Sequence, residues 1–211
     1  GAKSHIALAG PANKQGRIAA DHICGRRSAY TGALGTSVLK LFDLTAASTG
    51  LNEKQARAAG VAYDKVVTYS ASHASYYPGA RNMTVKTLFD PASGRILGAQ
   101  IVGFDGVDKR MDVLAAAIRA GLTAEQLTEL DLAYAPPYGS AKDPVNMAGY
   151  VIENVRAGLV EQHHWDAVAE LPADGSVILL DVRTPGEVRK QGLLRSDALH
   201  IPLDELRGRL G

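Results

Sequence analysis

Short segments in which apolar and polar residues alternate occupy the middle of the chain and predict β-strands. These segments lie at residues 37–44, 63–69, 83–89 and 96–102. The last two are separated by Asp90-Pro91-Ala92-Ser93-Gly94, a turn sequence, so they are expected to form a hairpin. Because no long crossover connections separate successive segments, the predicted sheet is antiparallel.

Helical periodicity and capping residues predict helices beside this sheet. Asn52 with Gln55, and Thr123 with Gln126, have the spacing of capping boxes. One further helix is predicted from apolar residues at helical spacing and another from an aspartate before a proline: Met111, Leu114 and Ile118, and Asp143 with Pro144. The last helix should run to about residue 157. The predicted fold class is therefore α+β, an antiparallel sheet with flanking helices that cover one side of it.

A separate helix is predicted near the N-terminus. It begins around Pro11 with no strand before it. Its first-turn N–H groups form a positive helix terminus that can stabilise an anionic partner. The helix ends at Cys24, with Gly25 at the C-cap. Because activated cysteines usually lie near helix N-termini, Cys24 is expected to be a buried small hydrophobe and not a reactive thiol.

The composition changes after Gly158, which suggests a linker to a second unit. In that unit the apolar residues 177–181 predict a fully buried strand. Thr184, Pro185 and Glu187 have the types expected at N-cap, N1 and N3, so a helix should follow directly, as in α/β architecture. About 45 residues bury too little surface for an independent α/β domain, so this unit is expected to be incomplete.

Composition and charge exclude several classes of protein. The 211 residues include 23 Lys and Arg against 22 Asp and Glu, and this net charge of +1 gives no support to a nucleic-acid or membrane surface. No apolar run approaches the roughly 18 residues of a membrane-spanning helix, and no signal-peptide pattern is present. With Cys24 as its single cysteine the chain can form no internal disulfide, which fits a cytoplasmic location.

Familiar catalytic and metal-binding motifs are also missing from the sequence. There is no Gly-rich dinucleotide fingerprint, P-loop or Cys/His cluster at metal-ligand spacing. His163 and His164 are adjacent, while His73 and His200 are isolated, so these four are expected to be surface or loop histidines. No metal site is predicted.

Two tyrosine-containing turns are the candidates for chemistry. They contain Tyr76 and Tyr77 before Pro78-Gly79, and Tyr134 and Tyr138 around Pro136-Pro137. Because proline fixes φ and removes a backbone donor, neither segment suits a helix interior or a central strand. A phenol held in this way could donate a proton to a ligand, whereas the alternative is a structural turn whose tyrosines only pack. Two restrained tyrosine sites in one small sheet domain favour a functional role.

Four motifs resemble the C-terminal part of coenzyme A disulfide reductases, which belong to the FAD-binding pyridine nucleotide-disulfide oxidoreductases. They lie at residues 13–17, 72–80, 106–114 and 133–146, and the resemblance extends from residue 1 to about 158. Residues 180–210 are similar to the first half of a rhodanese domain. Together the two parts resemble fused reductase–rhodanese proteins, which include NADH-dependent persulfide and polysulfide reductases.

The resemblance implies three domains. Residues 1–33 would be the C-terminal remnant of the FAD-binding domain, residues 34–158 the dimerisation domain, and residues 163–211 the truncated N-terminal part of a rhodanese-like domain. It also implies a homodimer that uses FAD and NAD(P)H and reduces a coenzyme A disulfide or persulfide.

Roles for individual residues follow from the same resemblance. Tyr76 and Tyr134 would be catalytic, reaching across to the partner's active site to donate a hydrogen bond or proton to the leaving thiolate, with Tyr77 and Tyr138 as close competitors. Phosphate and pantetheine contacts would come from Asn13, Arg17 and Lys142. The helix terminus at Ala9, Gly10 and Pro11 would point at the flavin and favour its reduced, anionic ring.

The sequence departs from the family's pattern in several respects. It contains neither the Gly-rich FAD and NAD(P)H segments nor the redox cysteine, and Cys24 matches no motif position. A rhodanese cysteine would follow Gly211, which leaves Asp181 and Arg183 as supporting residues. The fragment alone is therefore expected to be inactive.

Two alternative functions remain open. One is an NADH oxidase or peroxidase of the same superfamily, although Tyr76, Tyr134 and Lys142 favour coenzyme A substrates because oxygen needs no phosphate-binding cation. The other is a non-catalytic dimerisation module.

Overall fold

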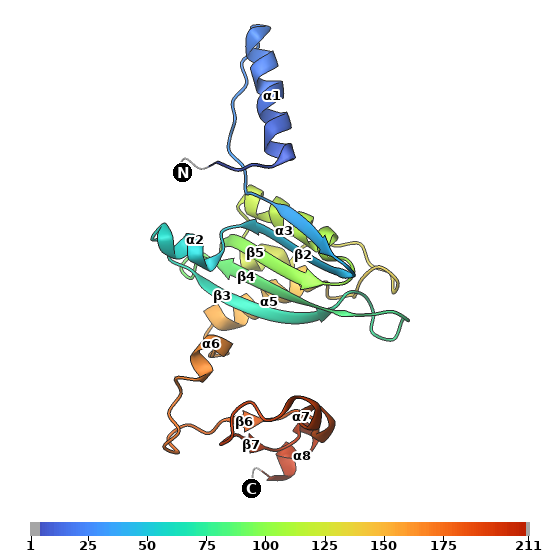
Figure 1. Cartoon of the computed structure of the whole chain (residues 1–211), viewed down its shortest axis with the longest axis vertical. Coiled ribbons are helices and arrows are strands. Elements are labelled where there is room, and N and C mark those ends of the chain that lie inside the picture. Colours follow the sequence, from blue (N-terminus) through green and yellow to red (C-terminus); the bar gives the residue numbers. More distant parts are fainter. Residues whose placement is uncertain (1–4, 210–211) are drawn as a thin grey trace. The chain divides into compact units, whose positions relative to one another are not determined.

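The computed structural model describes residues 5–209, and the chain divides into two compact units after Glu161 (Figure 1). The first unit contains, in chain order, α1 (Ala9–Ile23), β1 (Ser37–Leu41), β2 (Leu44–Gly50), α2 (Glu53–Ala58), β3 (Asp64–Ala71), β4 (Asn82–Phe89), β5 (Ile96–Gly103), α3 (Val107–Ala120), α4 (Ala124–Thr128) and α5 (Pro144–Arg156). The second contains α6 (Trp165–Val168), β6 (Leu180–Asp181), α7 (Pro185–Gln191), β7 (Leu199–His200), α8 (Leu203–Leu206) and a 3₁₀ turn (Arg207–Arg209).

The first unit is built on a five-stranded sheet in the order β1-β2-β5-β4-β3. Every neighbouring pair is antiparallel, so the predicted α+β fold class is confirmed. The hairpin between β4 and β5 forms as predicted. Asp90 stabilises its turn, because one carboxylate oxygen accepts hydrogen bonds from the main-chain N–H groups of Ala92 at 2.8 Å and Ser93 at 3.0 Å.

The prediction of one strand over residues 37–44 is wrong. β1 ends at Leu41, the chain reverses at Phe42 and Asp43, and β2 returns along β1 to Gly50. Phe42 adopts φ of +53°, a left-handed conformation that bulky residues rarely take. The sequence has no turn signal of the Asn-Gly type at Phe42 and Asp43, so the reversal could not be identified from the sequence.

The core lies between one face of the sheet and helices α3 and α5 (Figure 1). Helix α3 packs on β2 and β5, and α5 packs on β3 and β4. The largest fully buried apolar side chains include Met83, Leu88, Phe89, Ile101, Met111, Leu114, Leu127 and Ile152. The prediction that helices cover one side of the sheet is thus confirmed.

Each of the predicted capping boxes forms. Asn52 and Gln55 exchange side-chain and main-chain hydrogen bonds at 2.9 and 3.0 Å at the start of α2. The same reciprocal arrangement begins α4 at Thr123 and α5 at Asp143. A reciprocal cap satisfies first-turn donors that would otherwise lack partners, which explains why these short helices begin where the sequence predicts.

The second unit has only a small core among its described residues. Its strands β6 and β7 are two residues long and pair in parallel, and the predicted capping box at Thr184 begins α7. The prediction of a fully buried strand over residues 177–181 is wrong, because the strand covers only Leu180–Asp181 and Ile178 is 74% exposed. An apolar run becomes a buried strand only where flanking strands and helices cover it.

Helix α1 has no buried residue. Its C-terminal end is open, with Ile23 86% exposed, and Cys24 is exposed as well. The prediction that Cys24 is buried is therefore wrong, because nothing in the described part of the chain covers this end of the helix. Gly25 does adopt the positive φ of +75° expected just after a helix. Within residues 5–209, no helix is both long and apolar enough to cross a membrane.

Candidate functional site

Two loops at one end of the sheet bring the phenol groups of Tyr76 and Tyr134 together. Tyr76 lies in the loop between β3 and β4, and Tyr134 lies in the loop between α4 and α5. Their hydroxyl oxygens are 3.2 Å apart, within hydrogen-bonding distance. Both rings are reachable from solvent, with exposures of 76% and 47%. Residues far apart in the sequence therefore form one polar pair that a ligand can approach.

The Tyr76 loop is closed by hydrogen bonds at its base. The N–H of Ser72 donates to the carbonyl of Arg81 at 2.9 Å, and the N–H of Arg81 donates to the Ser72 hydroxyl at 3.2 Å. His73 lies inside the loop, with Nδ1 3.1 Å from the Ser72 hydroxyl and Nε2 3.3 Å from the Pro78 carbonyl. Since a carbonyl can only accept, Nε2 carries the proton and Nδ1 accepts from Ser72. His73 lies in a loop, as predicted, although it is only 5% exposed.

The Tyr134 loop contains a compact turn around the diproline. The N–H groups of Tyr138 and Gly139 both donate to the carbonyl of Ala135, at 2.8 and 3.1 Å. One main-chain hydrogen bond then joins the two loops, from the N–H of Ala74 to the carbonyl of Gly139 at 2.8 Å.

Arg110 on α3 contacts both of these loops. It is not among the site residues that the sequence predicts. It is 1% exposed and pairs with Asp143 at 2.9 Å, and the same nitrogen lies 2.9 Å from the carbonyl of Ser72. The sequence signal for a buried arginine is the helical spacing of Arg110 from Val107 and Leu114, which places it on the buried face of α3. A charged residue at an apolar position of a helix indicates a buried ion pair.

The competing tyrosines do not join this pair. Tyr77 packs edge-on against the His73 ring, with centroids 5.9 Å apart. The side chain of Tyr138 is 72% exposed. Lys142 is exposed beside the buried Asp143, on the loop that carries Tyr134.

The hydrogen bond between the phenols changes the acidity of Tyr134. It raises the pKa of Tyr134 above its ordinary value, mainly through the Tyr76 side chain and to a lesser extent through burial. Only one phenol donates within the pair, so the other keeps its proton available for an outside acceptor. The pair can thus donate a hydrogen bond to an outside acceptor.

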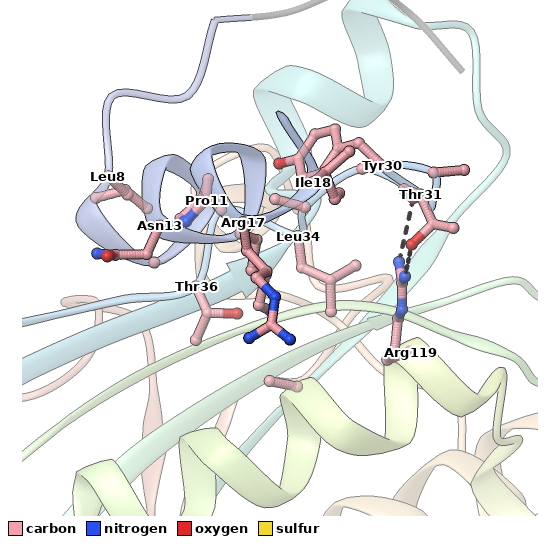
Figure 2. A pocket seen from close by; sticks show the side chains of 17 residues that line it. Leu8, Pro11, Asn13, Arg17, Ile18, Tyr30, Thr31, Leu34, Thr36 and Arg119 are labelled. Atoms are coloured by element: carbon pink, nitrogen blue, oxygen red, sulfur yellow. Dashed lines mark hydrogen bonds between the residues drawn. The ribbon is translucent and has the colours of Figure 1, made fainter. Parts of the chain in front are cut away.

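A second feature lies between α1, the segment 29–36 and α3, where a cavity of about 740 Å³ opens (Figure 2). Gly10, Pro11, Asn13 and Arg17 line it, and Ala9 does not. Figure 2 shows the side chain of Arg17 extending from α1 toward α3, while Arg119 on α3 hydrogen-bonds Thr31. The amide of Asn13 donates to the carbonyl of Ala9 at 3.0 Å.

Both the helix terminus and the cations give this cavity a positive character. The first turn of α1 contains no acidic residue and no side-chain cap, so the N–H groups of Ala9 and Gly10 remain available. Pro11 has no N–H, and the N–H of Ala12 donates to the carbonyl of Leu8 at 3.2 Å. Lys14, Arg17 and Arg119 add positive side chains. The donor set fits a ligand that carries negative charge, such as phosphate or a reduced flavin ring. Among residues 5–209, no group of His, Cys, Asp and Glu side chains is arranged to hold a metal ion.

The sequence-predicted site residues therefore fall into two sets. Asn13, Arg17, Gly10 and Pro11 share the cavity beside α1, whose lining does not include Tyr76, Tyr134 or Lys142. Tyr76 and Tyr134 form the pair at the loops between β3 and β4 and between α4 and α5.

Comparison with solved structures shows close similarity over the described fold. The reduced CoADR-RHD of Bacillus anthracis is 50% identical, with a TM-score of 0.91 over 99% of this chain and 37% of that protein. A NAD-dependent persulfide reductase from A. fulgidus is 42% identical, with a TM-score of 0.89 over all of this chain and 37% of that protein.

Comparison of sequences gives a consistent result. Coenzyme A disulfide reductase of Staphylococcus haemolyticus is 40% identical over 70% of this chain, and the chain spans about a third of the length of that relative, 33%. The family model for the dimerisation domain of pyridine nucleotide-disulphide oxidoreductases matches residues 36–144, just over half of the chain. The chain therefore belongs to the pyridine nucleotide-disulphide oxidoreductase family, through its dimerisation domain.

Proposed function

We propose that this chain is the C-terminal portion of a flavin-dependent NAD(P)H oxidoreductase that reduces coenzyme A disulfide or a coenzyme A persulfide or polysulfide. The observation that carries the proposal is the 3.2 Å contact between the hydroxyls of Tyr76 and Tyr134. It is supported by the 40–50% identity to a coenzyme A disulfide reductase and to CoADR-RHD. In this proposal the chain supplies a dimer interface and the tyrosines, and the chain alone is inactive.

The phenol pair would assist departure of a thiolate. In the proposed reaction a cysteine thiolate of the complete reductase attacks one sulfur of the disulfide, the S–S bond breaks, and a mixed disulfide and a coenzyme A thiolate form. Tyr76 or Tyr134 would donate a hydrogen bond to the departing sulfur. Full proton transfer is unfavourable because a thiol has a pKa of about 8.5 and a phenol about 10, and the pKa of Tyr134 is raised further. The tyrosines therefore act mainly by hydrogen bonding.

The cavity beside α1 is the proposed binding region for substrate and cofactor. Asn13 and Arg17 would contact the phosphates and pantetheine of coenzyme A there. Lys142, which does not line the cavity within one chain, would add its charge from the tyrosine loop of a second subunit. Ala9, Gly10 and Pro11 at the start of α1 would face FAD, although Ala9 does not line the cavity. Bound FAD would supply the two electrons, taken from NAD(P)H, that return the mixed disulfide to free thiolate.

A homodimer would unite the two sets of residues. Within one chain the tyrosine pair does not line the cavity beside α1, so we propose that the tyrosines of one subunit reach the active site of its partner. Exposed apolar residues on β1 are consistent with an interface: Val38 is 60% exposed and Leu39 63%.

Residues 163–211 would be the N-terminal part of a rhodanese-like domain. What supports this is the β6-α7 arrangement with its capping box at Thr184. Arg183 holds the Asp181 carboxylate with two nitrogens, at 2.6 and 2.9 Å, and this side-chain contact lowers the pKa of Asp181 to about 2. Asp181 and Arg183 would support the fold and not act as nucleophiles.

The test of the tyrosines is the double variant Tyr76→Phe, Tyr134→Phe in the complete reductase proposed above. A hydrogen bond to a charged group contributes about 1.5–3 kcal/mol, so turnover of coenzyme A disulfide or persulfide should fall roughly tenfold to hundredfold. Reduction of the flavin by NADH should stay unchanged. The control is Tyr69→Phe, which alters a tyrosine on β3 that is about as exposed as Tyr76. Normal turnover in the double variant would remove the tyrosines from the mechanism.

The two alternative functions predict different results. An NADH oxidase or peroxidase would reduce oxygen or peroxide faster than any coenzyme A species, and its rate would not depend on Lys142. A non-catalytic dimerisation module would form a stable dimer in sedimentation experiments and bind no FAD. Flavin absorbance that remains with the purified chain after gel filtration would contradict the module.

A further inference from the structure

The guanidinium of Arg110 meets acceptors from three separate segments. Its nitrogens lie 2.9 and 3.1 Å from the Asp143 carboxylate, 2.9 Å from the Ser72 carbonyl, 3.2 Å from the Gly106 carbonyl and 3.5 Å from the Tyr138 carbonyl. The side chain of Arg110 is 2% exposed and that of Asp143 4%. Because the guanidinium of Arg110 is buried, water competes little with its hydrogen bonds to the loops.

These acceptors lie close to the phenol pair along the chain. Ser72 is at the base of the loop that carries Tyr76, and Tyr138 follows Tyr134 in the second loop. Asp143 ends the second loop and caps α5, where its carboxylate accepts from the N–H of Val145 at 3.1 Å. One side chain on α3 therefore contacts both loops.

We propose that Arg110 is a positioning residue that holds the hydroxyls of Tyr76 and Tyr134 together, by tying both of their loops to α3. The catalytic consequence of this role rests on the proposed function, whereas the geometric role concerns the chain itself.

A single link between the loops would not fix their orientation. The main-chain bond from Ala74 to Gly139 fixes one distance between the loops and does not by itself set the angle between them. Arg110 adds one contact to each loop, to Ser72 in the first and to Tyr138 in the second. Because the guanidinium is planar and its donors point in fixed directions, it sets an angle as well as a distance. A lysine at position 110 could pair with Asp143 but could not reach all of these acceptors.

The packing of α3 does not by itself require an arginine at this position. Val107, Met111, Leu114 and Ala117 supply the apolar contacts of this helix face. Removal of Arg110 alone would leave the Asp143 charge buried and unpaired, which would confuse a positioning effect with unfolding. A double change to neutral side chains avoids that problem, and asparagine can still cap α5.

Arg156 provides a control with a similar bonding pattern. It pairs with Glu125 and also donates to the carbonyls of Pro91 at 3.4 Å and Ala92 at 3.1 Å, away from the tyrosines. The test variant is Arg110→Met with Asp143→Asn, and the matched control is Arg156→Met with Glu125→Gln.

The primary measurement is NMR titration of the chain containing tyrosine labelled with carbon-13 at Cζ, whose shift reports the ionisation of each phenol. The Tyr134 resonance is identified by its loss in Tyr134→Phe. In the test variant the pKa of Tyr134 should fall toward about 10, as it should in Tyr76→Phe, whereas the control should titrate like the wild type. A cooperative thermal transition verifies that each variant is folded.

An unchanged Tyr134 titration in the folded test variant would overturn the proposal. Should that variant not fold, Arg110→Lys keeps the charge opposite Asp143, and the proposal requires a Tyr134 pKa between those of the wild type and Tyr76→Phe. A wild-type pKa in Arg110→Lys would overturn it.

A second measurement separates this proposal from the proposed function. In the complete reductase, the test variant should lower kcat roughly tenfold to hundredfold through misplacement of the tyrosines, with little change in KM. If Tyr76→Phe, Tyr134→Phe leaves turnover intact, the proposed function fails, while the NMR result still decides whether Arg110 positions the pair.

Discussion

The tyrosine pair and the cavity beside α1 are built in opposite ways. The two loops of the pair are joined by one main-chain hydrogen bond, and both contact the buried Arg110. The cavity is lined by cations that remain largely open, among them Arg17, whose side chain is 74% exposed and weakly paired with Asp21 at 3.5 Å. A hydrogen bond to a reacting atom depends steeply on geometry, whereas attraction to a phosphate depends mainly on charge. Under the proposed function, the region that would require accurate placement is therefore the region with buried support.

The largest difference between the two regions should appear in stability. Arg110→Ala leaves Asp143 buried without its partner and should lower the free energy of unfolding by about 3–5 kcal/mol. Arg17→Ala removes an exposed pair and should change it by less than about 0.5 kcal/mol. Urea unfolding of the chain, followed by circular dichroism, measures both. Equal effects of the two changes would contradict the contrast between a buried and an exposed arginine.

The second prediction concerns how the stability contributed by a partly buried ion cluster depends on pH. Glu53 on α2 contacts Lys65 at 2.9 Å and also Lys86, and its side chain is 16% exposed. Although burial opposes its charge, the two lysines outweigh that effect and lower the pKa of Glu53 from 4.5 to about 2. Because the folded pKa lies below the unfolded one, the stabilisation is present above pH 4.5 and is lost as the pH falls toward 2.

The measurement compares wild type with Glu53→Gln. The wild type should be more stable by about 1–2 kcal/mol at neutral pH, and the difference should disappear by about pH 2. Thermal unfolding at a series of pH values gives the difference directly, and it cancels the contributions of the other acidic groups. A difference that does not depend on pH would show that Glu53 stabilises the sheet by packing alone.

The smallest expected effect concerns the exposed cations. Lys142→Ala in the complete reductase should raise KM for coenzyme A species about 1.4-fold to fivefold, since an exposed pair contributes about 0.2–1 kcal/mol. The effect should weaken at higher salt, because salt screens exposed charges. Steady-state kinetics at two ionic strengths provides the measurement. A KM equal to that of the wild type at low salt would assign Lys142 to solvent and leave Arg17 as the proposed phosphate contact.

Local sequence signals predicted much of the fold. The capping boxes at Asn52, Thr123 and Thr184 and the turn after Asp90 involve residues a few positions apart, so their hydrogen bonds are encoded locally. The reversal at Phe42 was missed because its left-handed conformation is not favoured by the residue itself and is imposed by the pairing of β1 with β2.

Features that depend on distant contacts were harder to predict. The apolar residues 177–181 indicated a buried strand, but burial depends on what covers them, and Ile178 is exposed. The resemblance and the neighbouring prolines identify Tyr76 and Tyr134 as candidate site residues, although nothing local in the sequence specifies that their hydroxyls meet. Arg110 resembles an ordinary surface charge until the other buried residues of α3 show which face it occupies.

The link between Ala74 and Gly139 has a consequence for the evolution of this domain. It joins an N–H to a carbonyl, so any residue except proline at position 74 can provide its donor. Ala74 is only 6% exposed and Gly139 is buried as well, so packing, and not the bond itself, restricts both positions to small side chains. A comparison of sequences would therefore show small residues at these positions and give no sign of the bond that joins the two loops.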